Sequence, residues 1–242
     1  MTPAALVPVL AASAVASGAA IWWLYHRLSA TTPGLELAGL EFVAIDLETT
    51  GLDPRRDAIV ALAAIPFASG DPRPEAGYVS LVHPGRPIPP AAQAIHGIRD
   101  ADVRGAPSAA EALPRFLEIC QNRPVVAHTA AFDLAFINRF ARLGGLSTLG
   151  GVVLDIGALA HGLFPSWWDL SLEGLGRLLE VELVDRHTAR GDALSAGLIF
   201  LRMVPLLERH GVSTLDRTLK LQRRAALLPG GPGATGGGLV GP

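Results

Sequence analysis

Residues 41–51 read EFVAIDLETTG, and this stretch does most to decide the fold. Its first part, EFVAIDL at 41–47, is apolar and weakly alternating, which is typical of a strand, and the Thr-Thr-Gly turn at 49–51 ends it. Side chains two apart on a strand point to the same face, so Asp46 and Glu48 are predicted to present neighbouring carboxylates. Such a pair favours a cation between its members. The alternative is a solvated strand edge before a polar turn.

Strands and helices follow this first strand in an order that indicates an α/β fold. Two apolar runs rich in β-branched residues come next and predict an antiparallel meander, after which short strands alternate with helices. We therefore expect a mixed five-stranded sheet flanked by helices. The expected strands lie at 41–47, 58–67, 77–83, 124–127 and 152–154, and the expected helices at 108–120, 131–143, 171–180 and 189–207.

Two further motifs add acidic side chains. HTAAFD at 128–133 follows an apolar strand and places Asp133 in the first turn of a helix, where it could bind a metal or only favour the helix N-terminus. HTARGDA at 187–193 opens another helix, with His187 in the preceding loop and Asp192 on the first turn. A lone histidine is usually a surface residue. Four carboxylates with one histidine, however, supply ligands for two hard divalent cations and a general base.

Together, the three motifs resemble those of the DEDDh family of 3′–5′ exonucleases, which includes the proofreading epsilon subunit of bacterial DNA polymerase III. The resemblance spans about residues 41–205 and takes in DLETTG, HTAAFD and HTARGDA in order. HPGRPIPPAAQAIHGI at 83–98 and the triplet Val153-Leu154-Asp155 support it. The resemblance implies a ribonuclease-H-like fold, two Mg²⁺ or Mn²⁺ ions, and release of nucleoside monophosphates from the 3′ end of DNA, with RNA left open.

The resemblance also implies a role for each motif residue. Asp46 would bridge both metals, and Glu48, Asp133 and Asp192 would complete the two sites. His187 would deprotonate the attacking water, and its five-residue offset from Asp192 favours the histidine branch of the family over the tyrosine branch.

Substrate contacts are implied as well, around the 3′-terminal nucleotide. For His96 a structural role is the alternative, Thr129 stands where many relatives have Asn, and Asp155 is interpreted as a helix cap. The residues with an implied substrate contact are Thr49, Thr50, Gly51, Leu52, His128, Thr129 and His96.

Composition limits the remaining possibilities. The 242 residues suggest one medium domain with terminal extras, and the single cysteine, Cys120, excludes an internal disulfide or a cysteine-built zinc site. Residues 1–208 hold 15 basic and 21 acidic side chains, a net charge of −6, whereas residues 209–242 are net +4. Bound metals would offset the acidic excess and let a polyanion approach. The basic segment could guide nucleic acid or touch anionic headgroups, or be a solvated helix face.

The N-terminal segment is interpreted as a membrane anchor. Ala4–Tyr25 lacks charged side chains and ends in aromatic residues before Arg27, so it predicts one transmembrane helix with the following domain in the cytoplasm of a bacterial cell, at the inner membrane. A cleaved signal peptide and a soluble apolar helix are the alternatives. The expected organisation is an anchor at 4–25, a linker at 26–39, an exonuclease domain at 40–208, a basic helix at 209–228 and a disordered Gly/Pro-rich tail at 229–242.

The expected partners are the membrane and single-stranded or 3′-terminal nucleic acid. A polymerase partner and a homodimer are left open. So is a different class of function, a membrane-tethered module that binds nucleic acid or acts as a scaffold with little catalysis.

Overall fold

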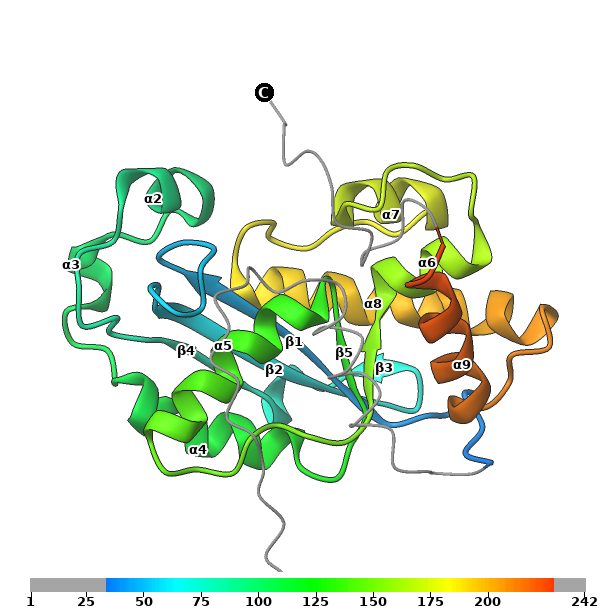
Figure 1. Cartoon of the computed structure of the whole chain (residues 1–242), viewed down its shortest axis with the longest axis horizontal. Coiled ribbons are helices and arrows are strands. Elements are labelled where there is room, and N and C mark those ends of the chain that lie inside the picture. Colours follow the sequence, from blue (N-terminus) through cyan, green and yellow to red (C-terminus); the bar gives the residue numbers. More distant parts are fainter. Residues whose placement is uncertain (1–33, 229–242) are drawn as a thin grey trace, which may run out of the picture.

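A mixed sheet built around β1 (Phe42–Thr49) organises the protein, as a computed structural model that describes residues 34–228 shows (Figure 1). The other strands are β2 (Ile59–Ala68), β3 (Asp71–Pro72), β4 (Tyr78–Leu81), β5 (Val125–Ala127) and β6 (Val153–Asp155). The helices are η1 (Pro74–Ala76), α2 (Pro90–His96), α3 (Asp100–Val103), α4 (Ala109–Cys120), α5 (Ala130–Leu143), α6 (Ile156–Leu163), α7 (Leu172–Leu179), α8 (Ala189–Arg209) and α9 (Leu215–Ala225).

The strand order confirms the expected mixed sheet flanked by helices. Along the sheet the order is β3-β2-β1-β5-β6, and β4 also pairs with β2. The pairs of β2 with β1, β3 and β4 are antiparallel, whereas β1 with β5 and β5 with β6 are parallel. The five expected strands are present, and the two-residue β3 is an addition whose length is too short for a periodic signal.

Alternation along β1 gives the sheet two buried faces. Phe42 and Ala44 lie in the core beneath α8, whereas Val43 and Ile45 lie in the core on the side of α4 and α5. On the first face, Phe42 stacks on Phe67 of β2 with a centroid distance of 4.8 Å. The ring of Phe200, on α8, meets Phe42 edge-on at 5.0 Å, and this contact packs the helix against the sheet. Burial on both sides explains why β1 alternates only weakly in sequence.

Parallel pairing brings two strand ends together at one edge of the sheet, where two helices also begin. Because β1 and β5 run in the same direction, their carboxyl ends lie together. Helix α5 begins directly after β5, and the N-terminus of α8 lies near the same end of β1 (Figure 1). The acidic motifs of the sequence therefore meet at this edge.

Packed structure continues beyond the predicted domain limits of 40 and 208. The Leu37 N–H donates to the Ser213 carbonyl at 2.7 Å, and Leu37, within the predicted linker, is buried. Helix α9, within the predicted basic helix, is tied to β6 by Gln222, which accepts from the Asp155 N–H at 2.8 Å. Both segments thus belong to the packed body of the protein.

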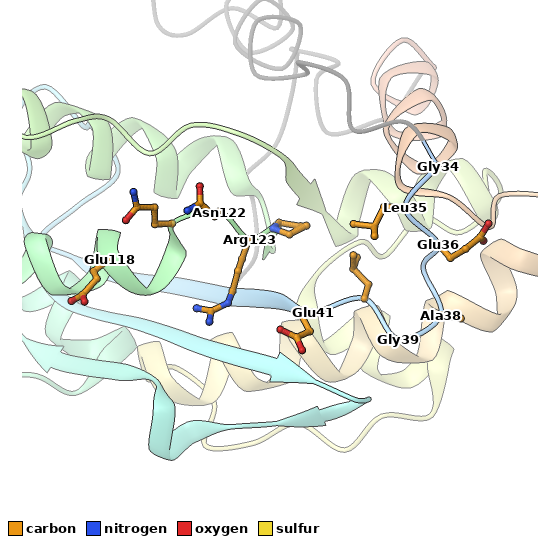
Figure 2. Close-up of a pocket in the computed structure, with 12 residues that line it drawn as sticks. Gly34, Leu35, Glu36, Ala38, Gly39, Glu41, Glu118, Asn122 and Arg123 are labelled. Carbon is orange, nitrogen blue, oxygen red and sulfur yellow. The ribbon is translucent and has the colours of Figure 1, made fainter.

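A hollow of about 930 Å³ lies between residues 34–41 and the end of α4 (Figure 2). Glu36, Glu41, Glu118 and Arg123 contribute charged side chains to its lining. The hollow lies at the amino end of β1, whereas the acidic motif lies at the carboxyl end, so it is separate from the site described below.

Among the described helices, none combines the length and apolar character needed to cross a membrane. The transmembrane helix predicted at 4–25 lies outside the described residues. The first part of the predicted linker, 26–33, and the predicted tail at 229–242 lie outside them too.

Candidate active site

Three acidic side chains from two distant segments converge at the carboxyl end of β1. Asp46 and Glu48 lie two residues apart on this strand, and Asp192 lies on the first turn of α8. Each offers a carboxylate oxygen within 4.8 Å of those of the other two. The prediction that Asp46 and Glu48 present neighbouring carboxylates is therefore confirmed, and Asp192 joins them.

The start of α8 is held in place by its own sequence. The Thr188 hydroxyl caps the helix by accepting from the Gly191 N–H at 3.0 Å. A side chain at Gly191 would bring its Cβ within 2.2 Å of the Asp185 carbonyl oxygen, so only glycine lets the preceding loop pass this close. The HTARGDA motif thus fixes the first turn from which Asp192 projects.

Asp133 lies beside these three residues. It is buried in the first turn of α5, and the nearby Leu47 backbone is one of the groups that favour its charged form and lower its pKa against the effect of burial. Its charge is one of those that raise the pKa of Asp46. All four predicted acids therefore share one electrostatic environment.

Burial and mutual repulsion hold protons on this group. Desolvation, followed by the charges of Asp133, Glu48 and Asp192, raises the pKa of Asp46 well above its ordinary value. Desolvation and the Asp192 charge raise the pKa of Glu48 to about 7, against the lowering effect of Arg186. Desolvation likewise raises the pKa of Asp133.

The donor set fits hard divalent cations. Carboxylate oxygens are the ligands that Mg²⁺ and Mn²⁺ prefer, and a cation would relieve the repulsion that raises these pKa values. Asp46, Glu48 and Asp192 are the residues placed to hold a metal ion.

The structure adds one cation that the sequence analysis did not select. Arg186 forms ion pairs with Asp192 and with Glu173 of α7, where its Nε donates to Glu173 Oε1 at 2.9 Å. Burial opposes the charge on Arg186, but the hydrogen bonds to Asp192 and Glu173 outweigh it and raise its pKa. No spacing rule distinguishes Arg186 from neighbouring loop residues, because only the fold brings α7 to this site.

His187 lies in the loop before α8 and is exposed. Its φ of 61° places it in the left-handed region, where a non-glycine residue is uncommon. It is not one of the residues whose ligand atoms gather within 4.8 Å. Burial opposes the charge of Glu173, but the hydrogen bond from Arg186, the Glu173 backbone and the charges of Arg186 and His187 outweigh it and lower the Glu173 pKa.

The residues after β1 that were predicted to contact substrate differ in whether their side chains are already engaged within the protein. The Thr50 hydroxyl donates to Asp57 Oδ1 at 3.1 Å and accepts from the Ala58 N–H at 3.0 Å, so the turn itself uses it. The Thr49 hydroxyl donates to the Gly51 carbonyl at 2.7 Å. Leu52, by contrast, is exposed and available to a ligand.

The remaining predicted contacts lie on two other segments. His96 is buried at the end of α2; burial lowers its pKa, although the nearby Thr49 backbone favours the charged form. Thr129 is the residue before α5 and has a left-handed φ of 59°. His128 Nε2 hydrogen bonds with the Leu170 carbonyl at 2.8 Å. Asp155 caps α6 by accepting from the Ala158 N–H at 3.0 Å, as the cap interpretation expected.

A family model described as Exonuclease matches residues 43–200, which is more than half of the chain. The chain belongs to the exonuclease family. The family resemblance read from the three motifs is thus confirmed, and the matched region includes Asp46, Glu48, Asp133 and Asp192.

Relatives among curated proteins include replication proteins. A DNA polymerase III subunit epsilon-like protein of Rhodobacter capsulatus is 40% identical over 190 residues, which cover 76% of this chain and 27% of that protein. The PolC-type DNA polymerase III of Caldanaerobacter subterraneus subsp. tengcongensis is 33% identical over 176 residues, covering 73% of this chain and 12% of that protein. The chain therefore spans only a minor part of the length of these relatives.

Solved structures support the fold. Exonuclease X in complex with 5′ overhanging duplex DNA has a TM-score of 0.59 and 24% identity, covering 76% of this chain and 99% of that chain. E. coli Exonuclease I in complex with a dT13 oligonucleotide has a TM-score of 0.60 and 18% identity, covering 71% of this chain and 42% of that chain. These likenesses confirm the ribonuclease-H-like exonuclease fold.

Proposed function

We propose that this exonuclease domain is a metal-dependent 3′–5′ exonuclease of the DEDDh type, which hydrolyses phosphodiester bonds to nucleoside monophosphates. One observation carries the proposal. Asp46 and Glu48 come from one motif and Asp192 from another, far along the chain, and yet the three place carboxylate oxygens within 4.8 Å of one another. A scaffold or simple binding module would have no need for such a costly group of acids that lie mostly out of solvent and close together.

The acids would hold two divalent cations, Mg²⁺ or Mn²⁺. Two such ions, when bound, clamp the attacking and leaving oxygens of a phosphodiester. The charges of Asp133, Glu48 and Asp192 all act on Asp46. Asp46 is therefore suited to bind both ions, and the other three acids would complete the two sites. The raised pKa values of Asp46, Glu48 and Asp133 mean that these three side chains would release protons as the ions bind.

His187 would act as general base. Its loop position directly before α8 and its exposure leave the ring free to turn toward a water at the site, and imidazole is the side chain that most often serves as a general base. Arg186 would orient this loop through its ion pairs with Asp192 and Glu173.

The substrate would be a single-stranded or 3′-terminal nucleic acid. Relatives named for DNA polymerase III and structural neighbours named in complex with DNA favour DNA over RNA. Exposed Leu52 would pack on the terminal base, and His96, His128, Thr129 and the turn at 49–51 would surround the nucleotide.

The cellular setting belongs to the same proposal. The apolar, uncharged composition of 4–25, followed by Arg27, supports a single-pass anchor at a bacterial inner membrane with the exonuclease domain in the cytoplasm. A C-terminal alkaline phosphatase fusion should be inactive if this orientation is right, and periplasmic activity of that fusion would contradict it. The names of the relatives, which include DNA polymerase III, are compatible with a polymerase as a further partner.

The proposed activity is tested with 5′-labelled single-stranded DNA and RNA of matched sequence, incubated with Mg²⁺, Mn²⁺ or chelator. We expect a ladder that shortens from the 3′ end, needs metal, and disappears in Asp46→Ala. A ladder that persists in Asp46→Ala would exclude this site as its origin. Tight binding without shortening would favour the scaffold function instead.

A further inference from the structure

Trp168 is a large aromatic side chain left almost fully in solvent. It lies in the loop between α6 and α7, and 87% of its surface is exposed. Its neighbour Trp167 is half-buried and folds back, with its Nε1 donating to the Asp169 carbonyl at 2.8 Å. The pair therefore separates into one indole that stabilises the loop and one that points away from it.

The loop that carries Trp168 is firmly held. The Asp169 carboxylate accepts from the Ser171 hydroxyl at 2.6 Å and from the Ser171 N–H at 3.2 Å, and it also forms an ion pair with Arg177 of α7. Leu170 packs against the main core. The exposure of Trp168 is thus a property of an ordered loop, and tryptophan is a residue type that is enriched at interfaces.

Two contacts tie this loop and α7 to the candidate active site. His128 Nε2 bonds to the Leu170 carbonyl at 2.8 Å. His128 follows β5, and the β1–β5 register, continued by two residues, places it level with Asp46 on the neighbouring strand. Trp168 is two residues from Leu170, so its Cα lies within about 7 Å of the Leu170 Cα.

The second contact runs through side chains. Glu173, in the first turn of α7, pairs with Arg186, and Arg186 pairs with Asp192. Figure 1 shows α7 above the same end of the sheet as α2, with the chain leading into α8 passing between them. The α6–α7 loop, which carries Trp168, therefore lies at the border of the site on the α7 side.

We propose that Trp168 is a stacking platform for a base of the substrate strand, so that the strand runs from the acidic residues across the α6–α7 loop. A base offers a flat π-face to an indole, whatever the sequence, and such stacking is the main sequence-tolerant contact to single strands. Arg177, 65% exposed beside the loop, supplies a cation for the adjoining phosphate. This inference rests on the proposed function and adds a binding position beyond the terminal nucleotide.

The test measures binding of the full-length protein to a 5′-fluorescent single-stranded DNA by anisotropy, in an Asp46→Ala background that prevents shortening. Loss of one stacked base typically weakens binding about 5- to 150-fold, and we expect this loss in Trp168→Ala. Trp168→Phe should recover most of the affinity. Leu143→Ala is the matched control, because Leu143 is 69% exposed at the far end of α5, and it should bind like the parent protein.

A set of strands with one abasic residue at successive positions from the 3′ end makes the test specific. An abasic residue at one of these positions should weaken binding to the parent protein. The same strand should bind Trp168→Ala as well as the intact strand does, because the two changes remove the same contact. Equal affinity of Trp168→Ala and parent, or an abasic penalty of the same size in both proteins, would overturn the inference. The inference would also be overturned if Trp168→Ala kept its affinity for DNA but lost binding to anionic lipid vesicles.

The outcomes separate this inference from the proposed function. If the protein with intact Asp46 shortens DNA while Trp168→Ala binds normally, the platform is wrong and the exonuclease stands. If no shortening occurs and Trp168→Ala loses DNA binding, the platform stands and the exonuclease is wrong.

Discussion

Replacing Glu48 with glutamine is expected to stabilise the metal-free protein above neutral pH. Burial and the charge of Asp192 raise the pKa of Glu48 from 4.5 to about 7. An unfolded chain loses this proton near the lower value, while the folded chain keeps it up to the higher one. The ionised carboxylate therefore destabilises the fold by an amount that is small below pH 4.5 and complete above pH 7.

The size of the effect follows from the difference between the two pKa values. At about 1.4 kcal/mol for each pH unit, the penalty at about pH 8 is about 3 kcal/mol, and at about pH 4.5 it is below about 0.5 kcal/mol. Glutamine has nearly the same shape and no charge. Glu48→Gln should therefore gain up to about 3 kcal/mol of unfolding free energy at the higher pH and almost nothing at the lower one.

Urea unfolding followed by circular dichroism, with chelator present at both pH values, measures this difference. Glu208→Gln, on the exposed end of α8, is the control and should match wild type. Adding Mg²⁺ should stabilise wild type more than Glu48→Gln, since an ion that binds only the native state raises its stability. A Glu48→Gln protein no more stable than wild type at about pH 8 without metal would refute the reasoning.

Three further predictions address the base, the cation and the core. His187→Ala should lower kcat about 100-fold or more, while Mn²⁺ affinity measured by calorimetry stays the same; an unchanged kcat would remove His187 from the mechanism. Arg186→Gln removes the counter-charge of Asp192, so Mn²⁺ should bind about tenfold tighter by calorimetry, and weaker binding would show that the ion pair does not compete with metal. Gly197→Ala would place a Cβ 2.3 Å from ring atoms of Phe67. It should therefore cost about 1–3 kcal/mol in urea unfolding, and wild-type stability would contradict the packing of α8 on β2.

The sequence predicted the parts of the fold that have strong local patterns. The β1 motif, the long helix after Thr188 and the helix after Ser108 were all placed to within a few residues. The Ser108 helix carries its start signal in the chain, because Glu111 accepts from the Ser108 N–H at 2.8 Å. Caps and buried faces are local or periodic properties, so the sequence displays them.

Helix α2 and strand β3 escaped because they depend on the assembled fold. Helix α2 has only seven residues, too few to be stable alone, although Pro90 at its start and left-handed Gly97 after its end mark it in retrospect. Strand β3 is a two-residue extension that exists only by pairing with β2. Neither has enough residues to show a period.

The candidate site divides in the same way. The four acids could be selected because each lies beside a strand end or helix start that the sequence displays. Arg186 and Trp168 could not, because their importance depends on the approach of α7 and its preceding loop to the acids. That approach is a long-range packing result, and it has no local signature.

The number of Mn²⁺ ions bound per chain tests the central claim most directly, since the account requires the acidic residues to hold two. Titration followed by electron paramagnetic resonance at about pH 8 counts free and bound ions. We expect two ions per chain for wild type and Glu208→Gln, and loss of both in Asp46→Ala. One ion or none in wild type, or an unchanged count in Asp46→Ala, would contradict the account.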